Sequence, residues 1–131
     1  MNVEGEAAID ELTYLINGCA MRVHTTLGPG LLESAYRACL KYELEQKGLL
    51  VEHEIGMPIR YGAVELDIGY RLDLVVERRV VLELKAAESL APIHKAQLIS
   101  YLKLGRYATG LLINFHVEHL RDGIHRLYPP R

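Results

Sequence analysis

Asp73, Glu83 and Lys85 are three of the ionisable side chains in a Val- and Leu-rich stretch between residues 71 and 86. Successive side chains of a β-strand point to opposite faces, so Glu83 and Lys85 share one face of the strand that contains them. If the turn before this strand centres on Arg78, residues whose numbers sum to about 156 face each other. Asp73 then lies opposite Glu83, on the face that carries Lys85.

Two opposed carboxylates in this position could bind a cation. Directly opposed side chains of an antiparallel pair have Cβ atoms ~4.5–5.5 Å apart, and two carboxylates ~4 Å apart repel by about 4 kcal/mol at an effective dielectric of 20. A shared proton or a cation must offset this repulsion. Two carboxylates and a strand carbonyl suit Mg²⁺ or Mn²⁺, and Lys85 could act on a water or stabilise a phosphate. The structural alternative is a solvated strand face with one salt bridge.

Two helical segments supply further polar candidates. Glu33 lies in the first turn of a helix that begins near Gly30, and Tyr36 follows one turn later. The helix macrodipole alone favours an acid at that position. Gln97 and Tyr101 are four residues apart on another helix and share a face, which is also consistent with a polar helix edge.

The pair His116 and His119, with Glu118 between them, is a weaker candidate. A zinc site there requires further ligands nearby. Histidines that follow a strand without such ligands are more often structural or exposed.

Hydrophobic periodicity and turn residues predict the elements that position these side chains. Helices are expected over residues 6–22, 30–47 and 92–105. Three consecutive antiparallel strands are expected over residues 50–60, 64–76 and 80–86, and two further strands over residues 107–115 and 124–128. The pattern predicts an α/β sandwich built around a mixed sheet.

Composition restricts the classes of function. The 131 residues predict one domain, with 50% hydrophobic residues to form a core. The net charge of −2 argues against a protein that coats nucleic acid through bulk positive charge, but it does not exclude an enzyme acting on phosphates. The single cysteines Cys19 and Cys39, an acidic N-terminal segment and the lack of a long apolar run predict a cytoplasmic protein without a membrane span.

Together, these motifs resemble the GxxExxY family, a group of small proteins within the PD-(D/E)XK nuclease superfamily. The matching residues are Gly30, Glu33 and Tyr36 for the family motif, Asp73, Glu83 and Lys85 for the superfamily core, and Gln97 and Tyr101 for the Gln-x-x-x-Tyr helix of the exonuclease branch. Leu72 replaces the proline of the nominal motif, a variable position in the superfamily. The resemblance extends from about Leu12 to Arg126.

The resemblance implies a restriction-endonuclease-like fold over residues 1–131, with a mixed β-sheet flanked by α-helices. By the same resemblance, Asp73 and Glu83 bind Mg²⁺ or Mn²⁺ with the help of the Leu84 carbonyl, and Lys85 acts on the attacking water. Glu33 supports the metal or its waters. Gln97 and Tyr101 orient the site or the substrate phosphate.

The expected function is Mg²⁺-dependent hydrolysis of a phosphodiester in DNA or RNA by a metal-activated water, with DNA favoured as the partner. A non-catalytic interaction module that retains the nuclease fold is the alternative. A basic rim around the Asp73 cleft would favour a nucleic-acid substrate; its candidates are Arg37, Lys41, Lys95, Lys103 and Arg106. Cutting both strands of a duplex would be easiest for a homodimer.

Overall fold

The computed structural model describes residues 3–131. Its helices are α1 (Val3–Leu27), α2 (Glu33–Gln46) and α3 (Pro92–Gly105), with a short 3₁₀ helix η1 (Leu120–Gly123). Its strands are β1 (Val51–Gly56), β2 (Ile59–Tyr61), β3 (Val64–Leu66), β4 (Arg71–Val76), β5 (Val80–Lys85), β6 (Thr109–Asn114) and β7 (Ile124–Leu127). None of the helices in the described residues combines the length and the apolar character that a membrane span requires.

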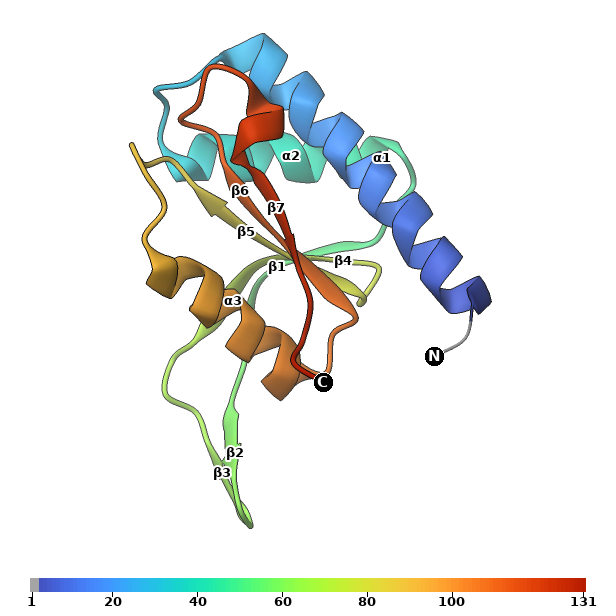
Figure 1. Cartoon of the computed structure of the whole chain (residues 1–131), viewed down its shortest axis with the longest axis vertical. Helices are drawn as coiled ribbons and strands as arrows, with labels where there is room; N and C mark the ends of the chain where they lie inside the picture. The colour runs from blue at the N-terminus through green and yellow to red at the C-terminus, as the bar shows by residue number, and fades with distance from the viewer. Residues whose placement is uncertain (1–2) are drawn as a thin grey trace.

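Five of the strands form one sheet in the order β1-β4-β5-β6-β7. All neighbours in it run antiparallel except β5 and β6, which run parallel. A parallel pair needs a crossover connection, and α3 provides it. Helices α1 and α2 lie on one side of the sheet and α3 on the other (Figure 1). The prediction of a mixed sheet flanked by helices is confirmed.

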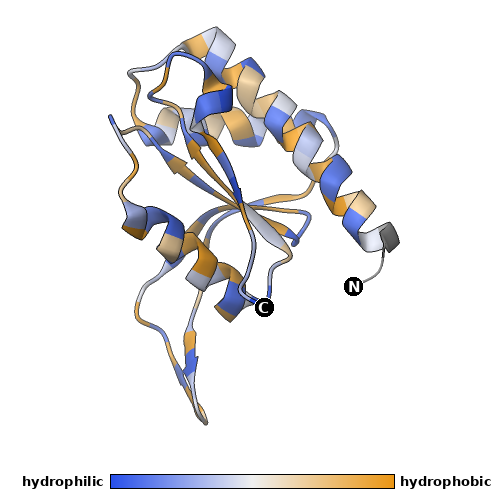
Figure 2. Ribbon diagram, in the orientation of Figure 1, coloured by the Kyte–Doolittle hydropathy of each residue, from blue (hydrophilic) through white to orange (hydrophobic). Residues whose placement is uncertain are grey.

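Each face of the sheet contributes to a separate buried cluster. Towards α1 and α2, the buried strand residues include Leu74, Val76, Leu82, Leu84 and Ile113. Towards α3, the cluster includes Val75, Val81 and Leu112 together with Leu98 and Leu102 of that helix. Figure 2 shows hydrophobic residues concentrated along the strands, as a sheet buried on both faces requires.

The prediction of long strands over residues 50–60 and 64–76 is wrong. Each segment is divided, and its outer part forms the separate hairpin β2–β3, which projects beyond α3 (Figure 1). Pro58 cannot donate a ladder hydrogen bond, and Gly69 has a left-handed φ of 84°. Pro58 follows the end of β1 and Gly69 precedes the start of β4, so the pairing of these two strands ends there.

Two predicted helix boundaries also shift. The first helix extends beyond the predicted residues 6–22 and ends at Leu27, because Gly28 follows with a left-handed φ of 70°. The second begins at Glu33 rather than near Gly30, whose φ of 101° excludes a helical conformation.

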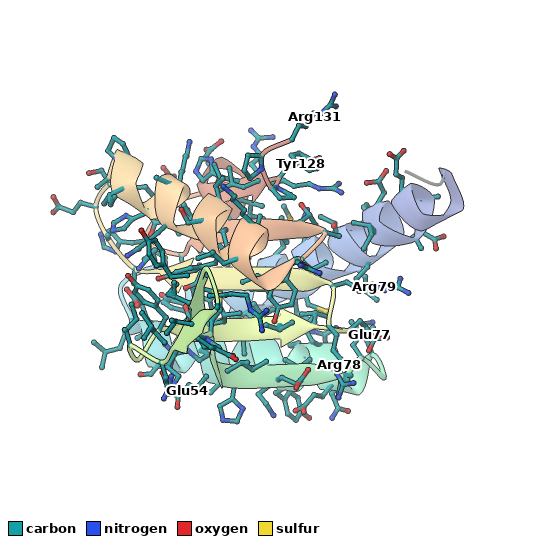
Figure 3. The ribbon with its side chains drawn as sticks, turned by 90° about the horizontal axis from the view of Figure 1, so that it is seen from below. Glu54, Glu77, Arg78, Arg79, Tyr128 and Arg131 are labelled. Carbon is teal, nitrogen blue, oxygen red and sulfur yellow. The ribbon has the colours of Figure 1, made fainter. Side chains whose placement is uncertain are left out.

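The predicted turn centre at Arg78 is confirmed. Val75 pairs with Val81 and Val76 with Val80, so the paired residue numbers sum to 156. The Arg79 N–H donates to the Val76 carbonyl at 3.0 Å. Figure 3 shows the turn residues together at one end of the sheet, with Glu54 at the other.

Candidate active site

The candidate site lies where β4 and β5 stop pairing. The last backbone pair of these strands joins Leu74 to Leu82. Beyond it, the Asp73 Oδ2 accepts a hydrogen bond from the Leu84 N–H at 2.9 Å. The Asp73 N–H in turn donates to Glu83 Oε1 at 3.4 Å. The two carboxylates therefore take the place of the backbone ladder, and the expected juxtaposition of Asp73 and Glu83 is present.

Strand β4 is irregular at this position. Leu72 and Leu74 are two residues apart, yet Leu72 packs in the α3 cluster and Leu74 in the cluster towards α1 and α2. On the adjacent strand β1, His53 pairs with Leu74 and Ile55 pairs with Leu72. Glu54, between them, has a left-handed φ of 51°. The sheet is thus distorted on both strands beside Asp73.

Burial and repulsion perturb the Glu83 carboxyl. Its pKa rises from the ordinary value of 4.5 to about 8, first because burial disfavours the charged form and second because the Asp73 charge is close. The Lys85 ammonium and the Asp73 N–H act in the opposite direction. In the protein without a bound cation, Glu83 is mostly protonated at neutral pH, and this proton offsets the repulsion.

This proton makes the stability of the cation-free protein depend on pH. The folded protein holds it up to about pH 8, whereas the unfolded chain releases it near pH 4.5. Its stabilising contribution is therefore complete below pH 4.5 and is lost as the pH rises to about 8. We expect Glu83→Gln, which mimics the protonated acid, to flatten this decline in urea unfolding measured with EDTA between pH 5 and 8.5.

The matched control is Glu45→Gln. This exposed carboxylate pairs with Lys41, and its replacement should preserve the wild-type pH dependence. If the free energy of unfolding of Glu83→Gln falls with pH as steeply as that of wild type, a raised pKa at Glu83 is contradicted.

Arg37 of α2 provides a second compensating charge. Its Nη2 lies 3.3 Å from Asp73 Oδ1, and the side chains of both residues are largely buried, at 24% and 20% exposure. The Nε atom of Arg37 is also buried and has no hydrogen-bond partner. Arg37 was predicted only as part of an outer basic rim. Its contact with Asp73 spans 36 residues and depends on how α2 packs on the sheet, so no local pattern indicated it.

The loop before α2 positions Glu33. The Tyr36 hydroxyl donates to the Gly28 carbonyl at 2.6 Å and accepts from the Leu31 N–H at 3.1 Å. The Tyr36 ring stacks on Phe115 with centroids 4.4 Å apart. With the helix start fixed in this way, Glu33 Oε2 accepts from the Ala86 N–H at 3.4 Å, immediately after β5. The structure thus brings Glu33 to the end of the strand that carries Glu83 and Lys85.

Removing the Tyr36 hydroxyl should loosen this loop. Tyr36→Phe leaves the stack on Phe115 intact but deprives the Leu31 N–H and the Gly28 carbonyl of their partner. Loss of hydrogen bonds in this partly buried loop costs about 0.5–1.5 kcal/mol of unfolding free energy per bond, which urea denaturation measures. Tyr42→Phe is the control, since Tyr42 is 60% exposed. An equal effect of both changes would contradict the anchoring role of Tyr36.

Lys85 lies at the end of β5, next to Glu83 and half-buried. Its charge lowers the pKa of Glu83, yet its ammonium forms no ion pair with any side chain described in residues 5–131. The backbone around it is held by β6: the Phe115 N–H donates to the Lys85 carbonyl at 2.9 Å. Asn114 binds Ala87 through both ends of its amide, at 2.8 and 3.2 Å. Asn114 was not among the predicted site residues, although a polar residue that ends an apolar run was the available indication.

The two candidates on α3 differ in their placement. Tyr101 is half-buried, and its pKa is raised by burial and then by the nearby charges of Glu83, Tyr70 and Asp73. Its ring contacts Tyr70, with centroids 5.7 Å apart. Gln97 is exposed and makes no hydrogen bond in the described part of the chain. The structure therefore associates Tyr101, but not Gln97, with the carboxylates.

The predicted basic rim is present only in part. Among its five candidates, Arg37 alone forms an ion pair with a site carboxylate in the described residues. Lys41 pairs with Glu45 of its own helix at 2.9 Å. Lys95 lies near His125 of β7, whose pKa it lowers after the larger effect of burial.

The carboxylate pair fits a divalent cation by its chemistry. Mg²⁺ keeps several waters and is usually held by one or two carboxylates, and Asp73 and Glu83 supply two close ones. Among residues 3–131, no group of three or more His, Cys, Asp or Glu side chains is arranged to hold a metal ion. The alternative zinc site at His116 and His119 therefore gains no support.

Comparison with known proteins agrees with this geometry. A family model described as the PD-(D/E)XK nuclease superfamily matches residues 10–127. The crystal structure of SSO0001 superposes with a TM-score of 0.52 at 24% identity, over 75% of this chain and 50% of that one. This chain thus spans about half the length of that structure, and the likeness concerns the fold. A search of curated proteins found no match. The sheet has the restriction-endonuclease-like arrangement, and the chain belongs to the PD-(D/E)XK nuclease superfamily.

Proposed function

We propose that this protein is a nuclease that hydrolyses a phosphodiester bond with a divalent cation held by Asp73 and Glu83. The observation that carries the proposal is the interlocked carboxylate pair where β4 and β5 separate. A buried pair with this repulsion destabilises the fold unless a proton, an arginine or a cation compensates it. A cation site accounts for its presence in a member of a nuclease superfamily.

The residues around the pair have separate proposed roles. When bound, the cation supplies positive charge to the phosphate and lowers the pKa of a coordinated water; Mg²⁺ and Mn²⁺ both suit the oxygen ligands, which include the Leu84 carbonyl. Lys85, whose ammonium has no ion pair in the described residues, acts on the attacking water or stabilises charge on the phosphate. Glu33 orients the end of β5 and the waters near it.

Tyr101 lies near the carboxylates and orients the substrate phosphate. We assign Gln97 the same role at the exposed surface of that helix, where a bound substrate would supply its hydrogen-bond partner. Membership in the GxxExxY family is supported by the Gly30–Glu33–Tyr36 motif, whose tyrosine anchors the loop before α2.

The proposal extends to the nucleic acid that is cut, the oligomeric state and the cellular compartment. We favour DNA over RNA, and a homodimer if both strands of a duplex are cut. Free Cys19 and Cys39 suit the reducing cytoplasm.

A cleavage assay tests the proposed function. Labelled single- and double-stranded DNA and RNA, with blocked and free ends, are incubated with the protein in Mg²⁺, Mn²⁺ or EDTA. We expect products from at least one substrate in Mg²⁺ or Mn²⁺ and none in EDTA. The Glu83→Gln protein, purified in parallel, should give none and thereby excludes a contaminating nuclease.

The opposite result would overturn the proposal. If no substrate is cut with any divalent ion and calorimetry shows no cation binding, the chain is an interaction module that retains the nuclease fold.

A further inference from the structure

Arg37 has an unusual position for a side chain beside a cation site. It is held by a single contact of 3.3 Å to Asp73 Oδ1, whereas an arginine that grips a carboxylate with both arms makes two contacts of about 2.7–2.9 Å. Its Nε–H is buried without a partner. The guanidinium is therefore close to Asp73 but not locked onto it.

The carboxylate that contacts Arg37 is the one proposed to bind the cation. Asp73 Oδ2 already accepts the Leu84 N–H at 2.9 Å, and Glu83 Oε1 accepts the Asp73 N–H. A divalent cation that binds between the carboxylates would share the Asp73 carboxylate with the Arg37 guanidinium. Two positive charges beside one carboxylate, in a largely buried position, repel each other.

The position of Arg37 on α2 restricts how it can respond. Tyr36, its neighbour in sequence, is fully buried and bonded to Gly28 and Leu31, and Leu40 is buried on the same helix. The helix backbone is thus fixed against the sheet. Only the long arginine side chain can withdraw from Asp73.

We propose that Arg37 is a resident counter-ion of Asp73, which a divalent cation displaces on binding, so that Arg37 sets the cation affinity of the site. This inference rests on the proposed function, because it assumes a cation between Asp73 and Glu83. Arg37 is a positioning residue in this arrangement. It keeps the carboxylate compensated until the cation replaces it.

The test is cation binding measured without substrate. Mn²⁺ is titrated into wild type, Arg37→Gln and Arg37→Lys by calorimetry at pH 8.5. We expect Arg37→Gln to bind Mn²⁺ about 3- to 20-fold more tightly than wild type, because one competing positive charge is removed. Arg37→Lys retains the charge and should bind close to wild type. Arg22→Gln removes an exposed arginine that pairs with Glu43 and should also bind like wild type.

Thermal unfolding supplies the second readout. In EDTA, Arg37→Gln should unfold at a lower temperature than wild type, because Asp73 loses its counter-ion. Saturating Mn²⁺ should raise its unfolding temperature by more than it raises that of wild type. A merely structural role would lower the stability but would not increase cation affinity.

The outcomes separate this inference from the proposed function. If wild type binds Mn²⁺ and Arg37→Gln binds equally or more weakly, the counter-ion role is overturned and the cation site stands. If Arg37→Lys binds as tightly as Arg37→Gln, the role of its charge is overturned. If neither wild type nor any variant binds Mn²⁺, the proposed function fails together with the inference.

Discussion

Replacing Lys85 by alanine should lower the rate of phosphodiester cleavage by about 100-fold or more, the usual contribution of a positioned acid–base group. Lys85 follows Glu83 by one strand repeat, and its ammonium forms no ion pair with the side chains described in residues 5–131. It is therefore free to act on the attacking water or the phosphate without being a cation ligand. A group that acts in the transition state affects kcat more than binding. Cleavage is measured under single-turnover conditions in Mg²⁺ at pH 8.5.

The control for this change is Lys47→Ala at the end of α2, where the side chain is exposed. It should retain wild-type cleavage. The Lys85→Ala protein itself should keep most of its Mn²⁺ affinity and, with Mg²⁺ present, should keep its urea midpoint. Cleavage by Lys85→Ala at the wild-type rate would remove Lys85 from the catalytic mechanism.

Asp73→Asn should weaken Mn²⁺ binding by more than tenfold. Even residues that only support a metal ligand cost about 10- to 100-fold in affinity when they are replaced, and Asp73 is proposed as a ligand. The amide keeps the shape of the carboxylate and an oxygen for the Leu84 N–H, so the backbone arrangement should persist. Calorimetry at pH 8.5, above the raised pKa of Glu83, measures the change with Glu83 mostly ionised.

Asp10→Asn provides the comparison for the loss of a carboxylate elsewhere. Asp10 pairs with Arg126 at 2.8 Å, and its replacement should leave Mn²⁺ affinity unchanged. Equal affinities for Asp73→Asn and wild type would place the cation, if one binds, away from β4.

The juxtaposition of Asp73 and Glu83 could be predicted because it depends only on the geometry of two neighbouring strands and the turn between them. Side chains alternate along a strand, and a short turn sets the register between two neighbouring strands. The turn at Arg78 followed these rules, and they placed the carboxylates together. Pro92 likewise predicted where α3 begins, because proline is favoured at the first helical position. At its other end the helix stops after Gly105, where Arg106 takes the left-handed conformation with a φ of 58°.

Contacts between distant segments could not be predicted in this way. Arg37 reaches Asp73 only because α2 packs across the end of β4, and Asn114 holds Ala87 only because β6 lies beside β5. Such features follow from the packing of the whole sheet, which hydrophobic periodicity does not encode.

The most direct test of the proposed cation site is to locate a bound cation in a crystal structure. Crystals of the wild-type protein grown at pH 8.5 with Mn²⁺ would reveal the ion by its anomalous scattering. We expect a peak within about 2.5 Å of carboxylate oxygens of both Asp73 and Glu83, with the Arg37 guanidinium no longer in contact with Asp73. Mn²⁺ bound at other residues, or a carboxylate pair that stays without a cation at saturating Mn²⁺, would contradict it.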